Sequence, residues 1–458
     1  MALHRVKTSG GEQAEDVYAT YLAGSPLPKL RIPEHGGAPR AISSLLRDEL
    51  LLDGNAKQNF ATFCTTWVDD EARRLMADSM NKNVIDKDEY PQTAVIEERC
   101  VHMLAELWNA PRESAVGCST AGSSEAAMLG GLAMKFAWRK RRAAKGQDVE
   151  RPNLVCGPVQ ICWKKFARYF DVELREVPLR GDALGLEPEA LESVCDERTI
   201  GVVATLGVTF SGVYEPVLEL SNELDRIAIR HGFDIPIHVD GASGAFVAPF
   251  IQPDLVWDFR VPRVHSINAS GHKFGLAPLG IGWVLWRDEE ALPRELVFDV
   301  DYLGGNMPTF ALNFSRPGGE VIVQYYEFLR LGRDGYALVQ RTCADTAAWL
   351  ARELASIGSL ELLYDGQGAL PAVTYCLKQS RPFTLYDVSE RMRMRGWQIA
   401  AYPLPPHRER TVVQRLLIRH GIGRDLVALL LDDLRDALAY LKQNPPAHST
   451  AKPSYHHT

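Results

Sequence analysis

The middle of the chain, from about residue 153 to residue 290, alternates short uninterrupted apolar runs with segments of helical periodicity. The runs are NLVCG (153–157), TIGVVATLGVTF (199–210), IPIHVD (235–240), RVHSINAS (263–270) and GIGWVLWRD (280–288). A strand without a polar face is buried on both sides, which is typical of a parallel sheet covered by helices. The pattern therefore predicts an α/β fold with a mostly parallel sheet, which binds its ligands at the carboxyl ends of the strands.

The rest of the chain predicts a division into four parts. Helices are expected over 93–110, 123–144, 216–232 and 320–357, with Gly232 suited to end the third. After Gly358, strands are expected over 369–378, 397–402 and 412–421, and helices over 384–396 and 425–443. We expect an N-terminal arm with short helices (1–55), a large domain that carries the site (56–345), a smaller α/β domain (346–445) and a Pro- and Ser-rich tail (446–458).

Charge and cysteine content exclude several classes of protein. The formal net charge of −7 at pH 7 argues against non-specific binding to nucleic acid or to anionic membranes. The 8 cysteines form no C-x-x-C pair and no zinc-site spacing, so we expect no metal site and a reducing compartment. No apolar run approaches the length of a membrane span, and the N-terminus lacks the apolar core of a signal peptide. We therefore expect a soluble, cytoplasmic protein without stable membrane insertion.

Small and polar residues open the segment STAGSSEAAM (119–128), where a helix is predicted to begin. The free N–H groups of a helix N-terminus, together with the hydroxyls of Ser123 and Ser124, are suited to bind a phosphate group. A serine in this position also serves as an ordinary N-cap, so the motif alone leaves both interpretations open.

Two further motifs place ionisable residues at the ends of predicted strands. Asp240 ends the run IPIHVD, where a carboxylate can stabilise a protonated ring nitrogen or simply cap the next turn. Lys273 lies in SGHKFG, with His272 beside it, directly after the run RVHSINAS. A lysine in a partly desolvated pocket has a lowered pKa and can form a Schiff base, whereas a lysine in a solvated loop has no such role.

Gln160 and Thr209 follow two other apolar runs, in CGPVQICW and GVTFSG, where plain turn chemistry also accounts for them. Together, these motifs provide a phosphate cradle, an acid for a pyridinium nitrogen and a Schiff-base lysine at one edge of a parallel sheet. That combination matches the needs of pyridoxal 5′-phosphate (PLP). The sequence therefore predicts a PLP-binding site at this edge.

The chain also contains several long and specific motifs. They are GSSEAAMLGG, NLVCGPVQICWKKFARY, VWDFRVPRVHSINASGHKFGLAPLGIGWVLWRDEEALP, VDYLGG and NFSRPGG. These motifs resemble bacterial PLP-dependent glutamate decarboxylase, and the likeness runs from about Asp48 to about Pro445, plus the last few residues. It implies the type I fold of PLP-dependent transferases, in the aspartate aminotransferase superfamily, with active sites at the interface of a homodimer.

The resemblance implies a role for individual residues around the cofactor. Lys273 would form the Schiff base, and Asp240 would pair with the pyridine nitrogen. Ala242 and Gln160 would pack against the two faces of the ring, while Thr209 would lie near the phenolic oxygen and the reacting carboxylate. The residues implied in phosphate binding are Ser123, Ser124, Ser270 and His272, with Ser315 contributed by the neighbouring subunit.

The resemblance also implies how the substrate binds. Arg415 matches the arginine that binds the α-carboxylate, although the residues alone would favour an exposed arginine on a strand. Thr62 and Phe63, with Asn83 and Asp86 of the partner chain, match the positions that receive the side-chain carboxylate. Two like charges at close range force one group to hold a proton, so Asp86 would suit an enzyme favoured at acid pH; otherwise it is a surface residue in a charged loop.

The implied reaction is the decarboxylation of L-glutamate to 4-aminobutyrate and CO₂. It consumes one proton, donated to the product by Lys273 or His272, and so would raise cytosolic pH, as in acid resistance. The alternatives are a PLP decarboxylase acting on another amino acid and a non-catalytic scaffold of the same fold. The substrate-side residues argue against the first alternative, and Lys273 with Asp240 argues against the second.

Further expectations concern a flap, the tail and the assembly. Tyr302 would lie on a flap near the site, and His457, in the terminal YHHT, would match a penultimate histidine that blocks the site at neutral pH. Residues 1–24 do not closely match the segment that takes acid-resistance members to the membrane, and Gly10–Gly11 is poor helix material, so that relocation is not expected. The active unit would be a homodimer, assembled into a homohexamer as a trimer of dimers.

Overall fold

The computed structural model describes residues 29–111, 114–300, 307–378 and 381–446. Contacts within the chain divide it into a first unit, Met1–Gln58, and a second unit, Asn59–Thr458. The first unit contains helix α1 (Pro39–Leu50) and the short 3₁₀ turn η2 (Ala56–Gln58). This division lies close to the predicted end of the N-terminal arm at residue 55, and the other predicted domain boundaries stay predictions.

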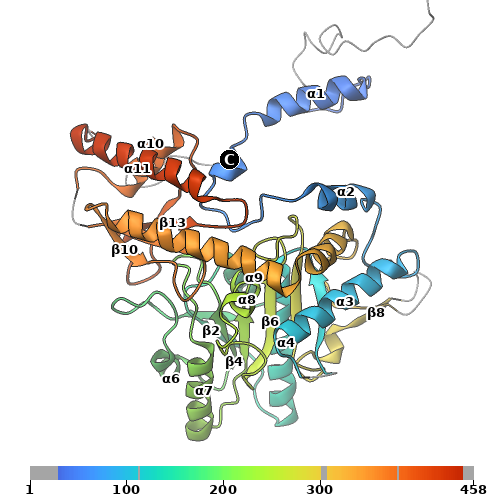
Figure 1. Ribbon diagram of the computed structural model, residues 1–458. Coiled ribbons are helices and arrows are strands. Elements are labelled where there is room, and N and C mark those ends of the chain that lie inside the picture. The colour runs from blue at the N-terminus through green and yellow to red at the C-terminus, as the bar shows by residue number, and fades with distance from the viewer. Residues whose placement is uncertain (1–28, 112–113, 301–306, 379–380, 447–458) are drawn as a thin grey trace, which may run out of the picture. The chain divides into compact units, whose positions relative to one another are not determined.

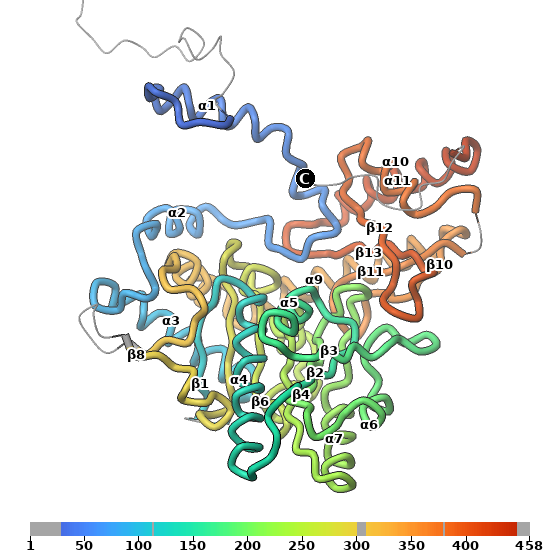
Figure 2. The backbone as a smooth tube through the Cα atoms, turned by 180° about the vertical axis from the view of Figure 1, so that it is seen from behind, coloured from blue at the N-terminus to red at the C-terminus, as the bar shows by residue number. Residues whose placement is uncertain are grey.

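The second unit is built on a seven-stranded sheet (Figures 1 and 2). Its strands are β1 (Val116–Thr120), β2 (Asn153–Cys156), β3 (Glu173–Glu176), β4 (Thr199–Thr205), β5 (Ile237–Asp240), β6 (Val264–Ser270) and β7 (Gly282–Trp286). Their order is β1-β7-β6-β5-β4-β2-β3, and β7 alone among them runs antiparallel to its neighbours. The prediction of a mostly parallel sheet is confirmed.

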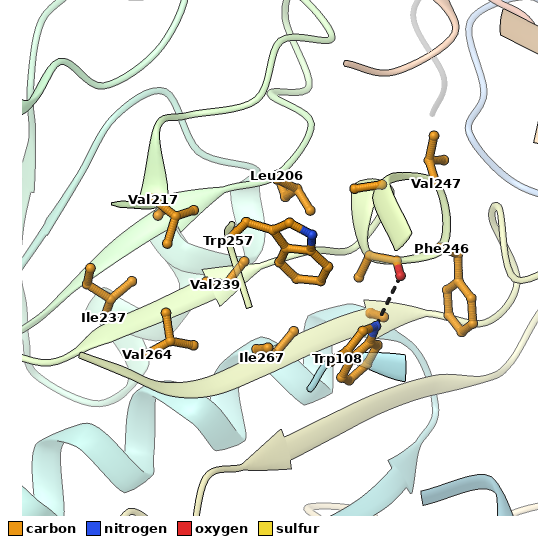
Figure 3. Packing of buried hydrophobic residues seen from close by; sticks show 14 of the residues in the cluster. Trp108, Leu206, Val217, Ile237, Val239, Phe246, Val247, Trp257, Val264 and Ile267 are labelled. Carbon is orange, nitrogen blue, oxygen red and sulfur yellow. Dashed lines mark hydrogen bonds between the residues drawn. The ribbon is translucent and has the colours of Figure 1, made fainter. Parts of the chain in front are cut away.

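Helices cover both faces of this sheet, and consecutive strand residues belong to two different hydrophobic clusters. Trp283 and Leu285 of β7 lie in a cluster with α3 (Pro91–Leu107), α7 (Val217–His231) and α9 (Gly319–Ala355). Val284 and Trp286 lie in the other cluster, with α4 (Ser123–Ala144) and α5 (Ile161–Tyr169). Figure 3 shows part of the first cluster, in which side chains of β5 and β6 lie beside Trp257 and Trp108. Burial on both faces explains why the strand sequences are continuous apolar runs.

The predicted helices are confirmed, with some differences at their ends. Helix α4 spans the predicted range 123–144. Helix α7 ends at His231, and Gly232 follows in the left-handed conformation, with φ of 75°. Helix α9 is interrupted at Gly332, where φ is 59° and ψ is −172°. None of the described helices combines the length and apolarity needed to cross a lipid bilayer.

A smaller sheet lies nearer the C-terminus of the same unit. Its antiparallel strands, in the order β10-β11-β13-β12, are β10 (Leu360–Tyr364), β11 (Ala372–Leu377), β13 (Val412–Leu417) and β12 (Ala401–Pro403). Helices α10 (Leu385–Arg393) and α11 (Arg424–Gln443) share a hydrophobic cluster with these strands and with the second half of α9. Strand β10 was not predicted from the sequence.

Several predicted strands are longer than the observed ones, since those predicted over 412–421 and 369–378 span only Val412–Leu417 and Ala372–Leu377. Two further strands differ for a reason that the hydrogen bonds show. The strand expected over 397–402 begins only at Ala401, because the Gln398 carbonyl accepts the N–H of Phe60 instead of joining the sheet. The strand expected over 199–210 ends at Thr205. There the Thr205 N–H donates to the Glu215 carboxylate, and the Thr205 carbonyl accepts the Glu215 N–H. These two backbone groups are thus bonded to the returning chain instead of to a neighbouring strand.

Replacing Ile200 in β4 with alanine tests how much the burial of strand side chains under the helices contributes to the free energy of unfolding. Ile200 is fully buried, so we expect Ile200→Ala to lower the free energy of unfolding by about 2–5 kcal/mol, because the cavity is only partly refilled. Ile229 on α7 is 86% exposed, and Ile229→Ala should change the free energy of unfolding by less than about 0.5 kcal/mol. Urea denaturation of both variants measures the difference, and equal effects would contradict this account of the sheet.

Candidate active site

A cavity of about 450 Å³ opens at the carboxyl ends of strands β4, β5 and β6. The residues that line this cavity lie at or just after the ends of strands and at the N-termini of helices α4 and α5. Residues predicted from the sequence that line this cavity are Ser123, Ser124, Gln160, Thr209, Asp240, Ala242, His272 and Lys273. The structure therefore gathers most of the predicted cofactor residues at the predicted edge of the sheet.

The Lys273 amine is held in this cavity among few polar partners. Its Nζ lies 3.4 Å from Ser243 Oγ and 5.1 Å from the centroid of the Phe63 ring. Burial lowers the pKa of Lys273, and the negative charge of Asp240 opposes that effect only in part. An amine with a lowered pKa is uncharged more of the time, so Lys273 is suited to nucleophilic attack on an aldehyde.

Asp240 places a carboxylate in the floor of the cavity. It ends β5 and is only 5% exposed. Its Oδ2 accepts the indole N–H of Trp163 at 2.8 Å, and its Oδ1 accepts the backbone N–H of Ala242 at 3.1 Å. A buried carboxylate needs a positive or hydrogen-bonding partner, and a protonated ring nitrogen on the cavity side would provide one.

The rim beside α4 carries polar groups suited to an anion. The Oγ of Ser270 and the Nδ1 of His272 are buried and have no hydrogen-bond partner among the described residues. Ser123 and Ser124 begin α4 at its N-terminus, directly after Gly122. Gly122 has φ of 144°, a conformation that side chains rarely adopt, and a Cβ there would lie 3.1 Å from His272 Cε1. Unsatisfied polar atoms beside a helix N-terminus fit the phosphate of PLP.

Arg415, in strand β13, is a buried cation beside the cavity. It is 5% exposed, which excludes the alternative of an exposed arginine. Its guanidinium stacks on Phe63, with Cζ 4.0 Å from the ring centroid, and donates to the carbonyls of Thr209 and Ala61. No carboxylate in the described part of the chain forms an ion pair with it, and burial lowers the pKa of Arg415. A buried cation without a counter-ion is suited to receive a carboxylate ligand.

The remaining predicted substrate residues are divided between two places. Thr62 precedes Phe63 in the loop beside Lys273. Asn83, Asp86 and Ser315 are not among the described residues that line this chain's cavity. Asn83 Nδ2 lies 3.4 Å from Ser315 Oγ, while Asp86 Oδ1 accepts the N–H of Glu89 at 3.0 Å. The predicted action of these three across a subunit interface stays a prediction, and Tyr302 and His457 lie outside the described residues.

Sequence reasoning assigned Thr62 and Phe63 to substrate binding but missed the hydrogen bonds by which the loop 59–65 fixes the position of the lysine backbone. The N–H of Thr65 donates to the carbonyl of His272 at 2.7 Å, and its hydroxyl donates to the carbonyl of Lys273 at 2.6 Å. At the other end, the Phe60 carbonyl accepts the N–H of Leu417 in β13 at 2.9 Å. No local sequence signal indicates these bonds, because they join segments about 200 or more residues apart.

A second missed residue, Glu125, joins the start of α4 to a distant loop. It lines the cavity and is buried, with its carboxylate accepting the N–H groups of Ala121 at 2.7 Å and Leu312 at 2.8 Å. An acidic residue in the first turn of a helix is a recognisable signal, since it is stabilised by the helix dipole. The bond to Leu312 depends on tertiary contact and was not predictable.

Comparisons with known proteins agree with this geometry. The model of the pyridoxal-dependent decarboxylase conserved domain matches residues 34–378. The chain belongs to the pyridoxal-dependent decarboxylase family. Its cofactor is therefore PLP, as the cavity and its unsatisfied polar atoms indicate.

Individual relatives are similar to this protein over nearly the whole chain. A glutamate decarboxylase of Aliivibrio fischeri is 54% identical over 453 residues, covering 98% of both chains. Glutamate decarboxylase alpha of Listeria monocytogenes is 45% identical, covering 95% of both chains. The solved structure of Lactobacillus brevis glutamate decarboxylase superposes with a TM-score of 0.91 at 45% identity, covering 94% of this chain and 98% of that one. The fold of this family member is thus the type I fold expected from the sequence.

The buried position of His272 predicts a pH effect on the cofactor-free protein. Burial lowers the pKa of His272 to about 4, with Lys273 adding to the effect, whereas a histidine in the unfolded chain has a pKa of about 6.5. The unfolded chain therefore binds a proton between these values that the folded chain does not. The contribution of His272 to the free energy of unfolding, up to about 3 kcal/mol, is present above about pH 6.5. It is lost as the pH falls to about 4, because protons then stabilise the unfolded chain.

The variant His272→Gln should remove this dependence. Between pH 7 and pH 4, the free energy of unfolding should fall less steeply for His272→Gln than for the unsubstituted protein, as measured by urea denaturation without PLP. The exposed His35 provides the matched control, since His35→Gln should leave the slope unchanged. Identical slopes for all three proteins would show that His272 titrates normally.

Proposed function

We propose that this protein decarboxylates L-glutamate to 4-aminobutyrate and CO₂, with the consumption of one proton. The observation that carries the proposal is the juxtaposition, in one cavity, of a buried amine, Lys273, and a buried carboxylate, Asp240. The substrate follows from the relatives named glutamate decarboxylase, which are 44–54% identical to this chain and cover 94–98% of its length. The enzyme is accordingly a carboxy-lyase.

The cavity residues hold and orient the cofactor. Ser123 and Ser124 at the start of α4 and His272, two residues beyond the end of β6, would bind the phosphate group, together with Ser270, which ends β6 and has a buried hydroxyl without a partner among the described residues. Asp240 binds the ring nitrogen and keeps it protonated. At the faces and edge of the ring we assign Ala242, Gln160 and Thr209, which all line the cavity. Lys273 would anchor the cofactor through its amine.

PLP, when bound, accepts the electron pair that remains at Cα after the carboxylate leaves as CO₂. The protein's part is to orient the substrate so that the bond to that carboxylate breaks rather than its neighbours. Arg415 holds the α-carboxylate, supported by its burial and the absence of an ion-pair partner among the described residues. We favour Lys273 over His272 as the proton donor to Cα, because burial lowers the pKa of His272 to about 4 and so leaves its ring without the second proton near neutral pH.

The side-chain carboxylate of glutamate is received by residues of two subunits. Thr62 and Phe63 lie beside Lys273 in the loop 59–65. Asn83 and Asp86, together with the phosphate ligand Ser315, come from a partner chain, which agrees with their position away from this chain's cavity. The active unit in this proposal is a homodimer, and three dimers form a hexamer.

The enzyme acts in the cytoplasm in this proposal. All 8 cysteines lie in the described part of the chain and are free thiols, as expected in a reducing compartment. Consumption of a proton in each turnover would raise the local pH and so contribute to acid resistance. Tyr302 as a flap residue and His457 as a neutral-pH plug remain part of the proposal.

Replacing the lysine tests the proposed reaction. Purified protein incubated with PLP and glutamate between about pH 4 and pH 7 should release 4-aminobutyrate, and Lys273→Ala should lower the rate at least about a thousandfold, because the chain loses its nucleophile. The exposed lysine Lys442 is the matched control, and Lys442→Ala should retain full activity. Release of product from aspartate or an aromatic amino acid in place of glutamate would identify a different decarboxylase, and no product at all would favour a scaffold.

Mixed dimers test whether Asn83 and Asp86 act in the partner's site. One chain carries Lys273→Ala and the other carries Asn83→Ala with Asp86→Ala, each chain with its own affinity tag. Isolated mixed dimers should have about half the unsubstituted activity, because one of their two sites contains only intact residues. Each parent alone should be inactive or nearly so. If the mixed dimer is no more active than its parents, the residues act within their own chain.

A further inference from the structure

A layer of buried polar side chains is hydrogen-bonded to Asp240, directly or through one another. Oδ2 of Asp240 accepts the indole N–H of Trp163 at 2.8 Å, and Oδ1 accepts a side-chain N–H of Asn268 at 3.3 Å. Trp163 and Asn268 are both fully buried. A hydrogen bond to an ionised group in such surroundings is among the stronger interactions in a protein.

The chain of hydrogen bonds continues from Asn268 to two more buried residues. His238 Nε2 lies 2.7 Å from Asn268 Oδ1, and His238 Nδ1 lies 2.7 Å from Ser266 Oγ. An amide oxygen only accepts, so Nε2 carries the proton. Burial lowers the pKa of His238, so the ring is neutral and its Nδ1 accepts from the Ser266 hydroxyl. Every donor in the series Ser266, His238, Asn268 therefore points toward the Asp240 carboxylate.

Packing fixes the rings in this layer. Trp163 and His238 meet edge to face, with ring centroids 5.1 Å apart, and Trp163 meets Phe166 in the same way at 5.9 Å. Gly130 of α4 faces the His238 ring so closely that a Cβ at that position would lie 2.4 Å from Cε1. The two hydrogen-bond donors to Asp240 thus belong to side chains that have little freedom to move.

We propose that Trp163 and the series Ser266–His238–Asn268 are positioning residues that orient the Asp240 carboxylate and keep the shared proton on the ring nitrogen of the cofactor. Donors to a carboxylate favour its charged form, so they weaken its hold on a proton that it shares with another base. The inference rests on the proposed function, since Asp240 must meet the ring nitrogen of PLP. It extends that function by assigning residues that touch neither substrate nor cofactor.

The variant Trp163→Phe tests the proposal by deleting one N–H while keeping an aromatic ring. With PLP labelled with ¹⁵N in its ring, the ¹⁵N resonance of the loaded variant should move toward the position of an unprotonated pyridine. The Kd for PLP should rise and kcat should fall, each by about tenfold, as for the loss of one hydrogen bond to a charged group. KM for glutamate should change less than about twofold, because Trp163 does not line the cavity.

Trp108 offers a matched control elsewhere in the core. It is also fully buried, its indole N–H donates to the Ala245 carbonyl at 3.1 Å (Figure 3), and it meets Phe246 edge to face. Trp108→Phe therefore removes a similar buried hydrogen bond of an indole N–H, but one that does not involve a carboxylate. It should leave the ¹⁵N resonance and kcat unchanged. Thermal unfolding of both variants checks that they fold equally well.

A second variant keeps the test decisive if Trp163→Phe folds poorly. Asn268→Leu removes the donor to Oδ1 with a side chain of similar size, and it should shift the ¹⁵N resonance in the same direction. If both Trp163→Phe and Asn268→Leu match Trp108→Phe in ¹⁵N resonance and PLP affinity, these residues are merely structural. These two measurements need only bound PLP. Failure of the unsubstituted protein to produce 4-aminobutyrate would overturn the proposed function and leave this comparison intact.

Discussion

The constraint on which the site depends is the burial of the large sheet on both faces. A side chain such as Val284 or Trp283 meets a helix layer on whichever face it points to, so a polar group inside the strands needs an internal partner. Polar side chains that must meet a ligand can lie only where the strands end. Thr205, Asp240 and Ser270 are the last residues of three adjacent strands, and the cavity opens where these strands end, lined by Thr205 and Asp240 and by residues that follow the strands.

The sequence was most informative where function and local pattern coincide. Lys273, Asp240 and the start of α4 each follow a strand or begin a helix, so the order of elements was enough to predict that they meet. The long motifs then indicated the family. Parts of the chain after Gly358 were predicted less well, because the segment that contains Trp397 and Ile399 is buried like a strand but bonds to the loop 59–65 instead.

The sequence could not show which side chains bond to each other when they lie far apart along the chain. The series that supports Asp240 includes His238 and Ser266, which read simply as polar residues within apolar strands. Their meaning follows only from the parallel register of β5 and β6, which pairs His238 with Ser266 and Asp240 with Asn268. The strand interior thus contains buried polar groups, and His238 of β5 has its partners, Ser266 and Asn268, on the neighbouring strand β6.

The loop 59–65 has a mechanical consequence. Phe60 is bonded to Leu417 of the small sheet and Thr65 to the carbonyl of Lys273, while the Phe63 ring between them contacts both Arg415 and Lys273. The loop therefore links the small sheet to the segment that carries the lysine. The backbone of Lys273 is thus linked through this loop to strand β13, more than 100 residues further along the chain. A fragment that ended before β13 would keep every residue lining the cavity yet lose the anchor at the far end of this loop.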